Sequence, residues 1–395
     1  MNKTDRWLLP EGIEEVLPEK AKRLESLRRC LLDMYNSWGY ELVMPPFIEY
    51  LESLLTGTGH DLNLQTFKLT DQLTGRMMGV RADMTPQVAR IDAHQLKQET
   101  PTRLCYMGTV LHTRSDGFAG SRSPLQVGAE LYGHSGEQSD VEVLSLMIET
   151  LQLANIDKPC LDLGHVGIFR GLAQQANLST EQEAELFDAL QRKASVELHQ
   201  LVSSWKLNAM VSDMLIALAS LNGGAEVLVK AESVLSAAND TVKNALQNLA
   251  AIAQQVSARF DLPVNFDLAE LRGYNYHTGV VFSAYVAGQG QAIAQGGRYD
   301  DIGQVFGRAR PATGFSTDIK ILVETFQQQN EKCGAVFAPC ADGVDDAKLI
   351  AQIAELRQQG ERVICALSDQ QGGAKEMGCD RELIKSGSTW KVKKL

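Results

Sequence analysis

The sequence predicts an α+β protein: an antiparallel sheet flanked by helices, with a helical insertion and a small C-terminal α/β module. Three observations carry this prediction. Between residues 66 and 132, short apolar stretches lie too close together for parallel crossovers, except around residues 85–95. Residues 170–260 are rich in Ala, Leu, Gln and Glu and contain no proline, which favours a block of helices. After Asn330 the pattern changes to strand, helix and strand.

The N-terminal part is predicted to begin with a helix and a short strand. Apolar residues recur at three- and four-residue steps from Leu24 to Trp38, Pro18 suits the first turn, and Gly39 supplies the stop. A strand over residues 41–44 follows, and the two prolines after it favour an edge or an interface.

The predicted sheet contains strands at residues 77–80, 103–111 and 125–132. Between the first two, Thr85 is expected to cap a helix whose first residue is Pro86.

The middle of the chain is predicted to be mainly helical. One amphipathic helix is expected over residues 137–155, and four or five more over residues 170–260. Strand signals return at residues 264–268, 280–282 and 292–294. Pro311 and Gly314 then predict the entry to a helix that ends near Gln328.

The C-terminal module is predicted as a strand over residues 335–338, a helix over 345–359 and a strand over 363–366. The lysines at the very end, Lys391, Lys393 and Lys394, are expected to form a solvated tail. The expected domains are therefore residues 1–328 and 331–395.

Composition excludes several classes of protein. The chain has 395 residues, 44% of them hydrophobic, so it can build a sizeable core. No apolar run approaches the ~20 residues of a membrane span, and the first residues lack the apolar stretch of a signal peptide. Seven scattered cysteines without a C-x-x-C motif exclude a zinc ribbon and favour a reducing cytosol. The net charge of −11 argues mildly against nucleic acid as the main partner.

Four polar clusters stand out, at residues 81–85, 126–130, 272–277 and 296–300. In the second, Gln126, Gly128 and Glu130 share one face of a strand, because side chains alternate along it. Taken singly, each cluster is more often structural, as a helix cap, a solvated strand face or a turn.

Together the clusters describe a site for a small zwitterion. Asp83 and Glu130 are expected to receive an ammonium group, and Arg272 a carboxylate in bidentate geometry. Gln126 and the tyrosines Tyr276 and Tyr299 supply orienting hydrogen bonds or an aromatic wall. Buried charges need partners, so this mixture suits an amino-acid ligand better than an apolar one.

These residues resemble the motifs of a known protein family. Over residues 5–325 the sequence resembles histidyl-tRNA synthetase, a class II aminoacyl-tRNA synthetase, and more closely its non-synthetase relatives, the regulatory subunits of ATP phosphoribosyltransferase. The resemblance rests on motifs at residues 9–13, 16–18, 39–45, 272–277 and 296–300. The last two are similar to the histidine-recognition segments of that family. The fold that this implies is class II synthetase-like, with a truncated anticodon-binding-like module at the C-terminus.

Departures from the synthetase pattern indicate which relative this chain is. His112 stands where a synthetase has the arginine that holds the ATP α-phosphate, and Arg114 where it has a glutamate. Lys320 replaces an arginine that stacks on adenine, and an ammonium cannot stack as a guanidinium does. His277 replaces a second tyrosine of the histidine-recognition segment. The resemblance therefore implies a kept amino-acid site and a dismantled ATP site.

The resemblance also implies a function. The chain would be a non-catalytic regulatory subunit that activates the short-form ATP phosphoribosyltransferase catalytic subunit in the first step of histidine biosynthesis. L-histidine would act on it as the allosteric effector. The implied histidine-binding residues are Asp83, Thr85, His112, Gln126, Glu130, Arg272, Tyr276, His277 and Tyr299.

The expected assembly is a cytoplasmic hetero-octamer in which the regulatory chains form dimers through the first-motif region. No cofactor, metal, tRNA or membrane is expected to take part. Two alternatives stay open, an active histidyl-tRNA synthetase and a histidine sensor with another partner. The stretch over residues 116–124 is read equally well as an anion or partner contact and as a mobile hairpin loop.

Overall fold

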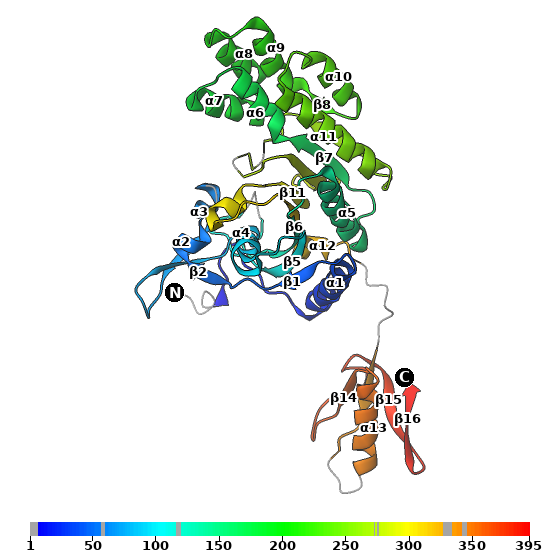
Figure 1. Cartoon of the computed structure of the whole chain (residues 1–395). Coiled ribbons are helices and arrows are strands. Elements are labelled where there is room, and N and C mark those ends of the chain that lie inside the picture. The colour runs from blue at the N-terminus through cyan, green and yellow to red at the C-terminus, as the bar shows by residue number, and fades with distance from the viewer. Residues whose placement is uncertain are drawn as a thin grey trace. The chain divides into compact units, whose positions relative to one another are not determined.

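The structure is a computed structural model and describes residues 7–56, 60–115, 120–271, 273–274, 276–326, 334–341 and 346–395. The chain divides into two compact units, residues 1–327 and 328–395 (Figure 1). None of the helices in the described ranges combines the length and apolar character needed to cross a bilayer.

A nine-stranded sheet forms the centre of the first unit. Its order is β1 (Glu41–Val43), β5 (Thr102–Thr109), β6 (Leu125–Tyr132), β12 (Ala312–Asp318), β11 (Ala294–Arg298), β10 (Val280–Tyr285), β7 (Cys160–His165), β9 (Val264–Asp267) and β8 (Asn222–Gly223). The central strands from β5 to β7 are antiparallel, which confirms the predicted character of the sheet. The sheet as a whole is mixed, because β1 runs parallel to β5 and β9 runs parallel to β7.

The two faces of this sheet are used differently. Helix α1 (Pro18–Ser37) and helix α5 (Glu137–Leu153) share one hydrophobic core with Cys105 of β5. Leu104 and Tyr106 of the same strand point the other way and pack with residues of α4 (Thr85–Arg90). This alternation is the period of two that a strand imposes. The second face carries the candidate site.

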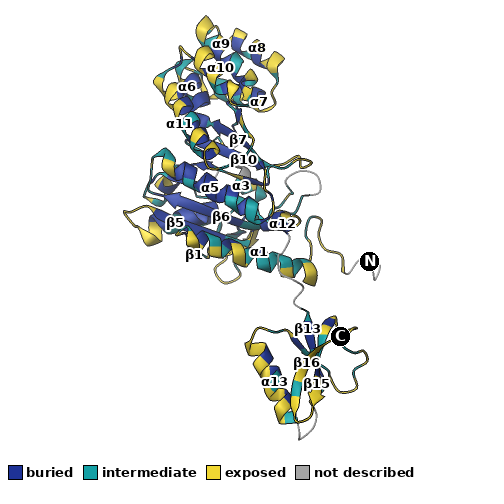
Figure 2. Ribbon diagram, turned by 90° about the vertical axis from the view of Figure 1, so that its right-hand side faces the viewer, coloured by how far each residue is buried: buried dark blue, intermediate teal, exposed yellow. Residues whose placement is uncertain are grey.

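The helical insertion contains six α-helices, one or two more than the sequence predicted, in a stretch that is described throughout. They are α6 (Val166–Gln175), α7 (Thr180–Gln191), α8 (Ser195–Ser204), α9 (Ala209–Ala217), α10 (Glu226–Val234) and α11 (Asp240–Ser257). A short 3-10 helix, η3 (Leu218–Ser220), lies between α9 and β8. In Figure 2 the outer faces of α7, α8 and α9 are mostly yellow and exposed, whereas β5 and β6 are dark blue and buried. The insertion therefore extends the core of the sheet on one side and meets solvent on the other.

A second, three-stranded sheet has the order β2 (Ile48–Tyr50), β4 (Met77–Val80) and β3 (Phe67–Thr70). Helices α2 (Leu51–Leu54) and α3 (His60–Gln65) lie between β2 and β3 in the chain. A π-helix, η2 (Ile91–Leu96), continues directly from α4, and a 3-10 helix, η4 (Ile302–Phe306), follows β11.

The predicted cap of α4 is wrong. Thr85 is the first residue of the helix, Met84 occupies the capping position, and Asp83 Oδ1 accepts a hydrogen bond from the Thr85 backbone N–H at 3.1 Å. The Thr85 hydroxyl lies 3.0 Å from the Tyr106 hydroxyl. The Thr85 hydroxyl therefore pairs with the buried Tyr106 hydroxyl and does not cap the helix.

The largest error of the prediction concerns residues 311–328. Pro311 and Gly314 do not lead into a long helix, because residues 312–318 form the central strand β12. Only α12 (Ile319–Leu322) is helical after it, and residues 327 and 328 lie outside the described part. Pro311 precedes the strand, where its missing N–H removes no ladder bond. The strand β7 was not predicted, and β11 begins at Ala294, so the strand predicted at 292–294 was placed too early.

The second unit has a four-stranded sheet of order β14 (Val363–Cys365), β13 (Ala335–Ala338), β15 (Cys379–Ser386) and β16 (Thr389–Lys394), with helix α13 (Ala347–Gln358). The predicted strand, helix and strand are confirmed, although residue 345 at the expected helix start is outside the described part. The expected tail is wrong, because its lysines lie in β16, which pairs with β15. Their side chains are nevertheless exposed, which suits an edge strand.

Candidate functional site

A cavity of about 220 Å³ opens on the second face of the large sheet. Its walls come from β6, β10, β11 and β12, from residues 83–85 and from the turn after β9. Of the nine residues expected to bind histidine, six line it: Asp83, Thr85, Glu130, Tyr276, His277 and Tyr299. The fold thus brings together side chains that are up to 216 positions apart in the sequence.

Glu130 lies at the bottom of this cavity and is 1% exposed. Its Oε1 accepts a hydrogen bond from the Tyr106 hydroxyl at 2.9 Å, and its Oε2 accepts one from the Tyr299 hydroxyl. Burial raises the pKa of this carboxyl to about 8, against the lowering effect of the tyrosine hydroxyls. Within the described part of the chain, the hydrogen-bond donors to Glu130 are hydroxyls and not cations. The carboxyl therefore prefers its neutral form until a positive charge arrives.

Asp83 supplies the second carboxylate of the cavity wall. Gln126 holds it with a hydrogen bond from Nε2 to Asp83 Oδ1 of 2.7 Å, while Gln126 Oε1 accepts from the Met84 N–H at 3.0 Å. Gln126 does not line the cavity itself, and its role is to position Asp83. These contacts confirm that Gln126 and Glu130 lie on one face of β6.

Tyr276 and His277 bring two rings to the opposite wall. The Tyr276 ring stacks on Tyr299 with centroids 5.0 Å apart, and its buried hydroxyl has no hydrogen-bond partner among the described residues. His277 Nδ1 lies 3.3 Å from the Arg298 carbonyl oxygen. Burial lowers the pKa of His277 to about 4, so the ring is neutral at physiological pH. The wall therefore offers an unused hydroxyl and an uncharged imidazole.

Two glycines leave the space that these side chains occupy. Gly314 of β12 stands opposite Glu130 of β6 in the sheet register, and a Cβ on it would lie 1.4 Å from Glu130 Oε2. A Cβ on Gly128 would lie 2.4 Å from the Tyr106 hydroxyl. Only glycine allows the carboxylate and its tyrosine to lie across these strands.

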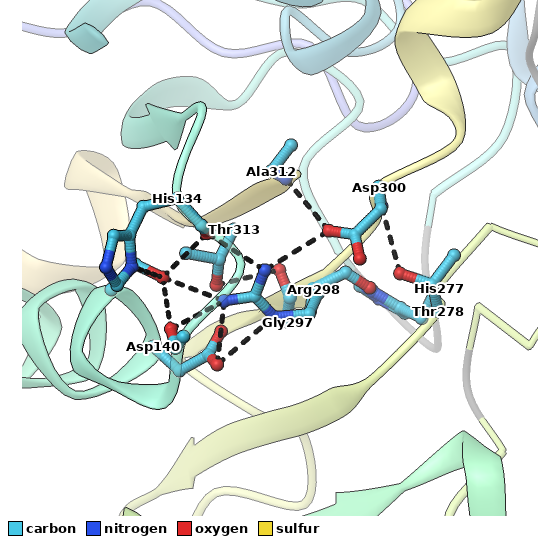
Figure 3. A network of polar contacts seen from close by, with 11 residues as sticks. His134, Asp140, His277, Thr278, Gly297, Arg298, Asp300, Ala312 and Thr313 are labelled. Carbon is cyan, nitrogen blue, oxygen red and sulfur yellow. Dashed lines mark hydrogen bonds and ion pairs between the residues drawn. The ribbon is translucent and has the colours of Figure 1, made fainter. Parts of the chain in front are cut away.

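Arg298 is the last residue of β11 and directly precedes the cavity residue Tyr299 in the chain. Figure 3 shows it between Asp140 and Asp300. Its Nη2 and Nε donate to Asp140 Oδ2 at 2.9 and 3.1 Å, and its Nη1 donates to Asp300 Oδ1 at 3.2 Å. The remaining donors bond backbone carbonyls and a hydroxyl of the 134–139 segment. This buried ion pair fixes the strand end that carries Tyr299, and Arg298 is not a ligand-facing cation.

Comparison with known proteins agrees with this arrangement. Residues 12–322 match the family model described as histidyl-tRNA synthetase. Residues 333–393 match the ATP phosphoribosyltransferase subunit HisZ C-terminal domain. The crystal structure of an ATP phosphoribosyltransferase regulatory subunit/histidyl-tRNA synthetase from Bacillus halodurans C is similar, with a TM-score of 0.82 and 28% identity. That match covers 94% of this chain and 96% of the other.

Curated relatives are similar over their whole length. The ATP phosphoribosyltransferase regulatory subunit of Thioalkalivibrio sulfidiphilus is 60% identical and covers 99% of both chains. The protein of the same name from Alkalilimnicola ehrlichii is 55% identical, over 100% of this chain and 98% of its own. The chain belongs to the family of ATP phosphoribosyltransferase regulatory subunits. Its fold is that of the class II histidyl-tRNA synthetases, with a C-terminal domain of the HisZ type.

Within this regulatory-subunit family fold, two of the expected residues do not line the cavity, and a third is outside the described part of the chain. His112 does not line the cavity, because its Nε2 bonds the Ala82 carbonyl oxygen at 2.8 Å. Gln126 acts through Asp83, as described above. Arg272 lies outside the described residues, as does Asn275 of the same motif.

Two of the positions that depart from the synthetase pattern, His112 and Lys320, have partners within the chain. Lys320 Nζ lies 3.4 Å from Glu14 Oε1 and 3.3 Å from the Ser123 hydroxyl. Arg114 is exposed. Residues 116–119 of the loop after it are outside the described part, so the two interpretations of that loop stay predictions.

Sequence reasoning missed several residues of the cavity wall. They are Glu270, Val281, Phe282, Ser283, Gln295, Phe315 and Ser316. Gln295 directly precedes the cluster at residues 296–300, and Ser316 follows Gly314 by two positions. Their closeness to these glycines could have indicated that they line the site. Val281, Phe282 and Ser283 belong to an ordinary apolar strand, and nothing local marks them. No group of three metal-ligating side chains occurs in the described part of this regulatory-family chain.

Proposed function

We propose that this chain is the non-catalytic regulatory subunit of an ATP phosphoribosyltransferase and that it binds L-histidine in the cavity. The observation that carries the proposal is Glu130, a buried carboxyl whose partners are tyrosine hydroxyls and which lines the cavity beside the carboxylate of Asp83. A carboxylate in such a place is costly unless a cation joins it. The ammonium or the protonated ring of an amino acid supplies that cation.

The dimensions and chemistry of the cavity support a small polar ligand. A volume of about 220 Å³ is below the range of roughly 300–1,000 Å³ typical of drug-sized ligands. Asp83 and Glu130 attract the positive groups of histidine, and the Tyr276 hydroxyl is available for a polar atom of the ring. Arg272, by family resemblance, receives the carboxylate.

The positions of the dismantled ATP site support the absence of adenylation. His112 is bonded to the backbone beside Asp83, and Lys320 is held by Glu14. Neither offers a guanidinium for a transferring phosphate or an adenine ring. This loss supports a role without adenylation.

The proposed partner is the short-form catalytic subunit of ATP phosphoribosyltransferase. Histidine in the cavity favours one arrangement of the complex over another, with a coupling of about 1–3 kcal/mol. By reciprocity, substrates of the partner weaken histidine binding by the same factor. The proposed assembly is a cytoplasmic hetero-octamer.

Within that assembly the regulatory chains pair through the first-motif region. Support comes from β1, which is an edge strand of the large sheet, and from the exposed apolar residues around it. These are Leu42, Met44, Phe47 and Ile48, between 41% and 79% exposed. An open edge with an apolar border is a surface that proteins normally cover.

Reconstitution tests the proposal. The chain is mixed with a short-form catalytic subunit, and phosphoribosyl-ATP formation is measured with and without histidine. The expected result is stimulation by the chain and inhibition by histidine that requires the chain. The absence of both effects would overturn the proposal. Histidine-dependent ATP–pyrophosphate exchange at a synthetase-like rate would instead support the active synthetase, and histidine affinity without any effect on the transferase would support a sensor with another partner.

A further inference from the structure

Tyr274 is the one aromatic residue of the turn after β9 that does not face the cavity. Gly273, Tyr276 and His277 of this turn line the cavity, but Tyr274 points into the helical insertion. The turn is tight, because the Tyr276 and His277 N–H groups both donate to the Gly273 carbonyl at 2.7 and 2.8 Å. One short turn therefore places rings in two different environments.

The insertion holds Tyr274 from two helices. From α6, Phe169 packs edge-on with centroids 5.1 Å apart, and Arg170 lies 4.7 Å from the Tyr274 ring centroid. Arg170 Nη2 also donates to the Tyr274 carbonyl at 2.7 Å. From α7, Phe187 lies 5.5 Å away by centroid, and Glu183 accepts a hydrogen bond from the Tyr274 hydroxyl.

These contacts connect the cavity-lining turn to the helical insertion. The first turn of α7 contacts the cavity-lining turn through Glu183 and Tyr274, which are 91 positions apart in the sequence. A hydrogen bond to a carboxylate is stronger and more directional than one between neutral groups. Tyr274 is thus packed against α6 and α7, while Tyr276 and His277 of the same turn line the cavity.

We propose that Tyr274 is a positioning residue that couples occupation of the cavity to the helices α6 and α7 of the insertion. The inference rests on the proposed binding of histidine in the cavity. It adds that histidine binding stabilises the helices of the insertion, and that the aromatic cluster of Tyr274, Phe169 and Phe187 transmits this stabilisation from the cavity. Coupling of this kind needs a packed element that both sites can bias.

Hydrogen exchange of the full chain with and without histidine tests this inference, together with calorimetric histidine affinities. In the wild-type chain, saturating histidine is expected to slow amide exchange in α7 by about tenfold, which corresponds to ~1.4 kcal/mol. In Tyr274→Ala the affinity should change less than threefold while the protection of α7 is lost. Tyr274→Phe keeps the ring packing and should retain part of the protection.

Glu183→Ala and Glu181→Ala form a matched pair in the first turn of α7. Glu183 accepts a hydrogen bond from Tyr274, whereas Glu181 accepts one from the hydroxyl of Ser179, the residue that caps the helix. The first variant should lose much of the histidine-dependent protection, and the second should keep it. A merely structural role of Tyr274 would lower affinity and protection together and would overturn the inference. So would protection in Tyr274→Ala equal to that of the wild type. Failure of the wild-type chain to bind histidine at all would overturn the proposed function and, with it, this inference.

Discussion

Replacement of Glu130 by glutamine removes the titrating group from the bottom of the cavity. Burial raises the pKa of Glu130 from 4.5 to about 8 in the folded chain. Between these two values the folded chain holds a proton that the unfolded chain has lost, so stability falls as pH rises through this window. Above pH 8 no further loss occurs, because both states are ionised. Glutamine does not titrate, so the Glu130→Gln variant lacks this slope.

The magnitude follows from the same pKa. A difference of one bound proton corresponds to about 1.4 kcal/mol per pH unit. Between pH 5.5 and 7.5 the stability of the variant relative to the wild type should therefore rise by roughly 2–3 kcal/mol, given the folded-state pKa of about 8. Urea denaturation at several pH values measures this difference. Glu185→Gln, at an exposed position of α7, is the matched control for the loss of one formal charge.

Histidine binding should respond in the opposite sense. A cationic group binds the ionised carboxylate, and the ionised fraction increases from about one tenth at pH 7 to about one half at pH 8 for a pKa of about 8. The dissociation constant of histidine for the wild type should thus fall about fivefold between these pH values. Glu130→Gln should bind histidine far more weakly at both. Parallel stability curves for variant and wild type would refute the buried-carboxyl reasoning, and unchanged histidine affinity would place the ligand elsewhere.

Three further variants test the surroundings of the carboxyl. Gly314→Ala introduces a Cβ 1.4 Å from Glu130 Oε2, so it should abolish histidine binding and lower the free energy of unfolding by about 1–3 kcal/mol. The control is Gly290→Ala, whose new Cβ would have no atom within 4 Å, and it should bind histidine normally. Arg298→Met leaves a buried aspartate without its cation and should cost about 3–5 kcal/mol in urea denaturation. For His277, burial lowers the pKa from 6.5 to about 4, so the unfolded chain binds the extra proton and stability is lost as pH falls between these values. His277→Phe should weaken this loss by about 1.4 kcal/mol per pH unit.

Each of these variants has an outcome that contradicts its reason. Normal histidine affinity in the Gly314 variant would show that strand β12 can move away from the carboxyl. An Arg298 variant as stable as the exposed-pair variant Arg192→Met would show that the buried network is not needed. If the His277 variant loses stability at acid pH as steeply as the wild type, the loss comes from other groups. One such group is His165, whose pKa burial also lowers to about 4.

The local elements of the chain were predictable because their signals are local. The helix α1 begins at a proline and stops before Gly39, which adopts a φ of +82°. Helix α5 ends at Leu153, and Asn155, with a φ of +65°, follows where the periodic apolar pattern stops. Residues Asp83, Glu130, Tyr276 and Tyr299 were recognisable from cluster and family resemblance, and the fold places all four on one cavity.

The prediction was wrong where pairing partners are distant. Strand β12 lies between β6 and β11 in the sheet, and most of its residues are buried. Because both of its faces are covered, the segment has no alternating polar face, and it consists largely of glycine and other small residues. Read alone, such a segment is ambiguous between strand and helix. The terminal lysines of β16 gave a different difficulty: their partner β15 is close in the chain, but an edge strand with charged side chains resembles a solvated tail.

The sequence by itself determined the fold class, the family to which the chain belongs, and the kinds of side chain that make the site. Only the tertiary structure decided that Gly314 stands opposite Glu130, that His112 bonds the backbone instead of facing the cavity, and that Tyr274 points into the insertion. The physical reason is that periodicity reports which face of an element is apolar, whereas register and strand order depend on segments nearly 200 residues apart.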